Sequence, residues 1–119
     1  MKKTPKIFES EYKFCLILWD NEPISASNIA KLCNEKLKWS KTTTYTVIKR
    51  LKDRGVVENQ NSIIRSLVTK ADVQLSELDE LIENRFEDSL PAFIAAFARS
   101  QNLSEKEIDE IRKIIEQAE

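Results

Sequence analysis

The spacing of apolar residues divides this chain into three short helices, a β-rich stretch and a second helical run. Apolar residues are nearly continuous from Tyr12 to Trp19 and then recur at three- and four-residue intervals. This pattern predicts helices over about 8–19, 26–36 and 41–54, although periodicity alone leaves a strand open for the first segment. Helix, short turn, helix, loop, helix is the order of a helix-turn-helix unit.

Two β-branched runs follow the third helix. They are 56–58 (Val-Val-Glu) and 62–68 (Ser-Ile-Ile-Arg-Ser-Leu-Val), and the polar tripeptide Asn59-Gln60-Asn61 lies between them. A short connection rich in Asn predicts a β-hairpin with this tripeptide as its loop. Placed directly behind a third helix, the hairpin would be the wing of a winged-helix domain; the alternative is a hairpin with a structural role alone.

The third helix has a start signal, a stop signal and a basic flank. Ser40 can accept a backbone N–H bond of the first turn, and Gly55 can adopt the left-handed conformation that ends a helix. Val47, Ile48 and Leu51 supply the apolar stripe. The segment 38–55 carries six cations, Lys38, Lys41, Lys49, Arg50, Lys52 and Arg54, against the single anion Asp53.

Charge is distributed unevenly along the chain. Residues 1–68 hold 13 Lys and Arg against 7 Asp and Glu, a net of +6, whereas residues 69–119 hold 6 against 13, a net of −7. The two values sum to the overall −1. A basic first part joined to an acidic second part indicates a module that binds a polyanion, attached to a region that does not.

Short hydroxyl side chains and long cations on one helix suit a DNA major groove, where base edges and phosphates are contacted together. The alternative is a solvated basic helix face. The residues predicted to contact double-stranded DNA are Lys41, Thr42, Thr43, Tyr45, Thr46, Lys49 and Arg50 of the helix and Arg65 of the hairpin.

From Lys70 onward the pattern is again helical, with a restart at Ser89-Leu90-Pro91 and a capping box formed by Ser104 and Glu107. Three amphipathic helices expose more apolar surface than a small winged-helix domain can cover. We therefore predict a two-fold homodimer, with an intramolecular cap as the alternative. The predicted dimerisation residues are Leu78, Ile82, Phe86, Phe93, Phe97, Ile108, Ile111 and Ile115.

Composition argues against several classes of protein. The chain has no His, one Gly and no CxxC pair, so neither a metal site, a cofactor nor an enzymatic centre is expected. Cys15 and Cys33 lie in apolar segments and are expected to be small core residues. The apolar run 14–19 is too short to cross a bilayer, so a cytosolic protein without membrane contact is expected.

Four blocks of residues resemble the penicillinase-repressor family, and together they cover nearly the whole chain. They are Glu11 with Trp19, Ala26-Ser27-Asn28-Ile29, Trp39-Ser40-Lys41-Thr42-Thr43 through Lys49-Arg50-Leu51 and Gly55, and Phe97 through Leu103-Ser104-Glu105 and Glu107-Ile108. The resemblance implies a repressor that is bound to a palindromic operator of a β-lactam-resistance-type operon. Its implied fold is mostly α-helical with a small β-hairpin, as a winged-helix DNA-binding domain (1–68) and a helical dimerisation region (69–119).

The resemblance also implies that a sensor-linked protease cuts the dimerisation region between an Asn and a Phe. The matching bond here joins Ala96 to Phe97. The family's Lys in the third helix falls on Thr42, and its apolar residue two places later falls on Thr44, so a changed operator sequence is expected. The copper-responsive relatives carry a Cys-rich C-terminal metal motif, whereas this chain ends Glu116-Gln117-Ala118-Glu119. The alternatives are a winged-helix module that binds protein, or a copper-type relative without the metal motif.

Overall fold

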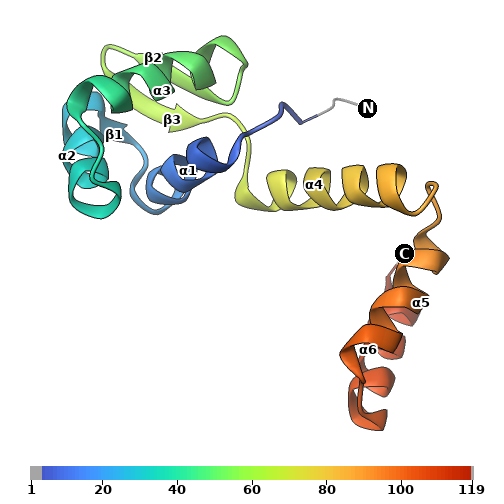
Figure 1. Ribbon diagram of the computed structural model, residues 1–119. Coiled ribbons are helices and arrows are strands. Elements are labelled where there is room, and N and C mark those ends of the chain that lie inside the picture. The colour runs from blue at the N-terminus through green and yellow to red at the C-terminus, as the bar shows by residue number, and fades with distance from the viewer. Residues whose placement is uncertain (1–3, 119) are drawn as a thin grey trace. The chain divides into compact units, whose positions relative to one another are not determined.

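The computed structural model describes residues 4–118, and most of them are helical (Figure 1). The chain divides into two compact units, Met1–Glu77 and Leu78–Glu119, which we describe one at a time. The elements are α1 (Glu9–Asn21), β1 (Ile24–Ser25), α2 (Ala26–Leu37), α3 (Lys41–Asp53), β2 (Val57–Gln60), β3 (Ile63–Ser66), α4 (Lys70–Arg85), α5 (Leu90–Gln101) and α6 (Glu105–Gln117).

In the first unit, α1, α2 and α3 pack with a small antiparallel sheet of strand order β1-β3-β2. The predicted first helix is confirmed as a helix, which resolves the strand alternative. Ser25 caps α2 by accepting the Asn28 N–H at 3.1 Å, as its place before the apolar periodicity predicts. Strand β1 was not predicted, because two residues are too short for a periodic signal; Ile24 pairs with Ile64 and Ser25 with Ile63.

The hairpin is confirmed, but its turn is shorter than predicted. Asn59 and Gln60 lie in β2 and pair with Ile64 and Ile63, so their assignment to the loop is wrong. The connection consists of Asn61 and Ser62, with φ values of 53° and 67°. A two-residue turn with both residues at positive φ matches the twist of the flanking strands, and Asn tolerates that conformation.

The core of the first unit is apolar and continuous. Both cysteines are buried in it, as expected, and neither forms a disulfide. The indole N–H of Trp19 donates to the Val68 carbonyl at 3.0 Å, and Val73 of α4 is only 2% exposed within this core. The first turns of α4 therefore belong to the same packed unit as α1. The largest fully buried side chains are Phe14, Leu18, Ile29, Leu51, Ile64, Val56 and Val57.

The second unit has well-formed helix starts but little burial. Ser89 caps α5, with Pro91 in its first turn, and Ser104 and Glu107 form the predicted capping box of α6. The rings of Phe86 and Phe93 meet edge to face with centroids 5.3 Å apart. Among residues 78–118 only Ile82 is buried. Within the described chain no helix has the length and apolarity that a bilayer span requires.

Candidate nucleic-acid interface

Helix α3 is held at both ends by the signals that its sequence contains. Ser40 accepts the Thr43 N–H at 3.1 Å. At the other end the Gly55 N–H donates to the Lys52 carbonyl at 3.0 Å and the Val56 N–H to the Leu51 carbonyl at 2.8 Å. With Gly55 at φ +80°, these two bonds form a Schellman motif. The helix is thereby confined to 13 residues.

One face of α3 is buried and the opposite face is exposed. Val47, Ile48 and Leu51 enter the core as predicted, and Thr44 is buried beside them. The seven α3 residues predicted to contact DNA are all exposed: Lys41, Thr42, Thr43, Tyr45, Thr46, Lys49 and Arg50. Side chains of one helix therefore separate into a core face and a basic, hydroxyl-rich face, the arrangement that a groove-reading helix requires.

Thr44 cannot take part in reading DNA. Its exposed fraction is 0%, so it offers no surface for a base contact. A changed operator sequence stays a prediction, and it now rests on Thr42 alone. Its Oγ1 has no hydrogen-bond partner among the described residues. Burial raises the pKa of the neighbouring Cys33 thiol. The Thr44 hydroxyl opposes part of that rise in the pKa, because it would donate a hydrogen bond to the thiolate form, although it makes none to the neutral thiol. Position 44 serves the core, whereas Thr42 remains on the outer face.

Two hydroxyls on the exposed face are already engaged within the helix. The Thr43 hydroxyl lies 2.9 Å from the Ser40 hydroxyl, and the Thr46 hydroxyl donates to the Thr42 carbonyl at 3.0 Å. The Thr46 hydroxyl therefore has no donor left for an external partner. The methyl groups and the remaining acceptor lone pairs of both threonines are still available on the surface. The hydroxyl of Thr42 makes no such bond to any residue that the structure describes, so its donor is available on this face.

Arg54 is not available to DNA, although it was counted with the basic flank. Its guanidinium forms an ion pair with Glu11, whose side chain is 5% exposed, and donates to the Lys6 carbonyl at 2.7 Å. The guanidinium carbon also lies 5.2 Å from the centre of the Phe8 ring. Glu11 accepts the Phe8 N–H at 2.9 Å as well. Arg54 thus fastens the end of α3 to the start of α1, and the exposed cations of α3 are Lys41, Lys49, Arg50 and Lys52.

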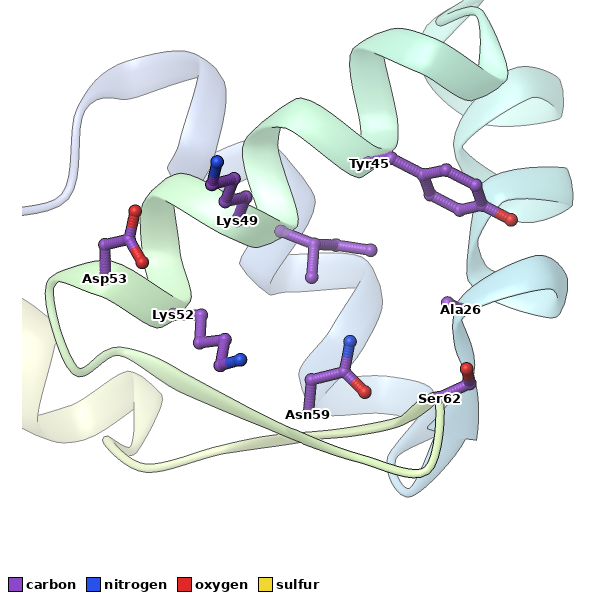
Figure 2. A pocket seen from close by; sticks show the side chains of 8 residues that line it. Ala26, Tyr45, Lys49, Lys52, Asp53, Asn59 and Ser62 are labelled. Carbon is purple, nitrogen blue, oxygen red and sulfur yellow. The ribbon is translucent and has the colours of Figure 1, made fainter.

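The hairpin supplies one cation and a groove. Arg65 of β3 is exposed and stands opposite Glu58 in the register, where the carboxylate offsets its charge. A groove of about 450 Å³ lies between α3 and the hairpin, with Ala26, Tyr45 and Ile48 as its apolar lining. Its polar lining consists of Lys49, Lys52, Asp53, Asn59 and Ser62 (Figure 2).

Sequence reasoning missed Lys52, Asn59 and Ser62 as residues of this surface. Lys52 is one of the six cations of the segment 38–55 but is not among the residues predicted to contact DNA. Asn59 and Ser62 are 7 and 10 positions farther along the chain than Lys52, and only the hairpin fold brings them beside α3. Assigning the turn to Asn61 and Ser62 alone would have placed Asn59 in the strand that lies next to the helix.

The described residues offer no metal centre and no reactive thiol. No group of three or more Cys, Asp or Glu side chains within 4–118 could hold a metal ion. Burial raises the pKa of the Cys15 thiol to about 12, with the nearby Glu11 carboxylate acting in the same direction. A thiol with so high a pKa is a poor nucleophile and a poor metal ligand at neutral pH.

The predicted dimerisation residues lie on α4, α5 and α6, except Phe86, which follows the last residue of α4, and most of them are partly or largely exposed in the single chain. Phe97 is 44% exposed, Ile108 40% and Ile115 59%. Phe86, Phe93 and Ile111 are half-buried, Leu78 is exposed and Ile82 is buried. The Ala96–Phe97 bond lies inside α5, as the flanking apolar stripes predict.

Comparison with known proteins agrees with this geometry. The family model of the penicillinase repressors matches residues 7–117. The methicillin resistance regulatory protein MecI of Staphylococcus aureus (strain Mu50 / ATCC 700699) is 29% identical over 117 residues, which covers 95% of each chain. The penicillinase repressor of Bacillus licheniformis is 27% identical over 122 residues, 98% of this chain and 94% of that one.

A solved structure is similar in fold. It is the solution structure of the monomeric form of Bacillus licheniformis BlaI in complex with the blaP half-operator, with a TM-score of 0.52 and 22% sequence identity. The match covers 60% of this chain and 93% of that chain. A mostly helical chain with a winged-helix arrangement is therefore confirmed. With a family match that extends over 7–117, the chain belongs to the penicillinase repressor family.

Proposed function

We propose that this chain is a transcriptional repressor that binds operator DNA through the exposed face of α3 and acts as a homodimer. The observation that carries the proposal is the separation of α3 into a buried apolar face and an exposed face of cations and threonines. The chain belongs to a family of transcriptional repressors, not enzymes. Its relatives include regulators of methicillin resistance, and we propose an operon of the β-lactam-resistance type as the target.

The proposed contacts follow from the side chains. Thr42 and Thr46 lie on the face opposite the core, where they can meet base edges. Lys41 lies with its Nζ 5.5 Å from the centre of the Tyr45 ring, so the two form one cationic edge suited to the phosphate backbone. Lys49 and Arg50 extend the same surface by one turn, and the exposed Thr43 and Arg65 are proposed as additional contacts.

The test is a double variant, Arg50→Ala with Lys41→Ala, measured on the DNA upstream of the chain's own gene. If Arg50 holds a guanine, specific binding falls by about 1–3 kcal/mol, while binding to random DNA changes less. If both cations hold phosphates, binding to all sequences weakens and the salt dependence becomes shallower. Binding that is unchanged by the double variant would contradict the proposal and favour a winged-helix module that recognises protein.

The proposed homodimer uses the apolar faces of α4, α5 and α6. These helices are capped and well formed, yet the single chain leaves large side chains such as Leu81, Phe97 and Ile114 between 44% and 66% exposed. Exposed apolar surface on this scale marks an interaction site. Covering it with a second copy would also place two reading helices on a palindromic operator.

We propose that repression ends when a sensor-linked protease cuts the chain, although the bond to be cut lies within a helix. The Ala96–Phe97 bond lies in the interior of α5, six residues or more after its first residue, so a protease must first unwind that helix. Cells that carry the native operon can be exposed to a β-lactam and probed for the repressor. A fragment of about 96 residues supports this route, because cleavage there would separate linked half-sites. Intact repressor together with induced transcription would exclude it.

A further inference from the structure

The groove between α3 and the hairpin shares Tyr45 and Lys49 with the contacts proposed above, but its polar residues Lys52, Asn59 and Ser62 have no role in them. Lys52 and Asn59 extend into it from opposite sides, one from the helix and one from β2, and Ser62 borders it at the hairpin turn (Figure 2). We propose that this groove seats one phosphodiester group of the DNA backbone, held by Lys52, Asn59 and Ser62. This inference rests on the proposed function, DNA binding, and names three residues that would hold the DNA backbone.

The geometry of duplex DNA places a phosphate here. We take the hairpin to lie against the minor groove next to the major groove that α3 enters. One sugar–phosphate strand then lies between the two elements, because that strand separates the major from the minor groove. When α3 occupies the major groove, the strand has to pass over the space between α3 and the hairpin. The groove of about 450 Å³ lies in that space.

The polar groups of the groove have the chemistry that a phosphodiester requires. Lys52 provides a point charge with three N–H donors, the Asn59 amide two donors and the Ser62 hydroxyl one. Lys52 forms no ion pair within residues 4–118, and the side chains of Asn59 and Ser62 make no hydrogen bond there. All three are exposed. Donors from two separate elements, α3 and the hairpin, therefore meet at this groove.

One carboxylate limits where the phosphate can lie. Asp53 borders the groove at the last turn of α3 and has no ion-pair partner within 4–118. An unpaired carboxylate repels a phosphate that approaches it, so the anion is directed toward Lys52 and Asn59 and away from the end of the helix. We infer that Asp53 reduces binding at shifted registers and thereby affinity for random DNA.

The experiment measures the salt dependence of binding to a random-sequence 30-base-pair duplex, because a phosphate contact does not depend on sequence. Lys52→Gln is expected to lower the slope of log K against log salt by about 0.9 for each bound protomer. Asn59→Ala is expected to weaken binding by about tenfold at an unchanged slope, since it removes a hydrogen bond and no charge. Asp53→Asn is expected to strengthen binding to the same duplex.

The matched control is Lys13→Gln, which removes the same charge from an exposed position of α1 outside the groove; its slope should equal that of the unmodified chain. Thermal unfolding of each variant checks the fold. The proposal is overturned if Arg50→Gln lowers the slope and Lys52→Gln does not. Absence of DNA binding by the unmodified chain would instead overturn the proposed function. A rise in Tm with inorganic phosphate that Lys52→Gln abolishes, at an unchanged slope on DNA, would assign the groove to free phosphate and overturn its assignment to DNA.

Discussion

The two units of this chain are built from equally clear helix signals but differ in how they bury apolar side chains. In the first unit Phe14, Leu18 and Leu51 are fully buried in one continuous core. In the second unit, within residues 78–118, Ile82 alone is buried, while Ile114 and Ile115 are 66% and 59% exposed. Helix capping thus sets where helices begin in both units, but it does not create a core. The first unit has the burial of a self-sufficient fold, whereas the second leaves apolar side chains uncovered in the single chain, which supports the proposed dimer.

The largest expected effect comes from separating the two units. A chain that ends at Glu77 keeps Val73 in the core of the first unit, whereas one that ends at Val68 loses it. We expect the chain ending at Glu77 to sediment as a monomer, whereas the full chain sediments at about twice 13.8 kDa. Affinity for a complete operator should fall by roughly 10²–10⁴-fold, because the two half-sites are no longer linked.

Binding of this shortened chain to a single half-site serves as the control and should equal that of one subunit of the full chain. A full chain that remains monomeric at micromolar concentration would contradict the interpretation of the second unit as a dimerisation surface. It would favour the alternative in which the C-terminal helices pack against the rest of the same chain.

A matched pair of alanine substitutions tests the contrast at single residues. Leu51→Ala removes a fully buried side chain and should lower the free energy of unfolding by about 2–5 kcal/mol. Ile115→Ala removes a comparable side chain from α6, where it is 59% exposed in the single chain. It should leave the unfolding of the first unit unchanged and weaken self-association. Denaturant unfolding and sedimentation equilibrium measure the two quantities. Equal losses of stability in both variants would contradict the distinction.

The smallest expected effect is a gain in stability inside the first unit. Thr44 is fully buried and its hydroxyl lacks a hydrogen-bond partner among the described residues. Thr44→Val replaces the hydroxyl with a methyl group of similar size and should raise the free energy of unfolding by about 1 kcal/mol. Thr46→Val is the control: its hydroxyl is exposed and donates to the Thr42 carbonyl, so a change within about 0.5 kcal/mol is expected. A loss of stability in Thr44→Val would show that the hydroxyl is satisfied.

Local sequence signals were sufficient for the helices. Ser25, Ser40 and Ser104 each cap the helix that their position predicts, and Gly55 ends α3 at positive φ. A cap depends on backbone atoms within three or four residues, so it can be recognised without knowledge of the rest of the fold. The exposed face of α3 was predicted for the same reason, because helical spacing alone separates its two faces.

The ends of the hairpin were harder to predict. The run Asn59-Gln60-Asn61 looked like a polar loop, yet Asn59 and Gln60 pair with β3. Their strand conformation comes from cross-strand hydrogen bonds, and the partner strand, not the local composition, decides which residues form them. Strand β1 escaped prediction for the same reason, since its two residues are defined by pairing alone.

The helices and the two faces of α3 could be predicted from the sequence because they depend on neighbours within one or two turns, and the contrast in charge follows from composition alone. Which polar side chains stay on the surface, and which are used inside the fold, depends on tertiary packing. It assigned Arg54 to Glu11, buried Thr44, and brought Lys52 and Asn59 to one groove. Contacts of this kind join residues from separate elements. They depend on how α1, α3 and the hairpin pack, and no spacing along the chain encodes that packing directly.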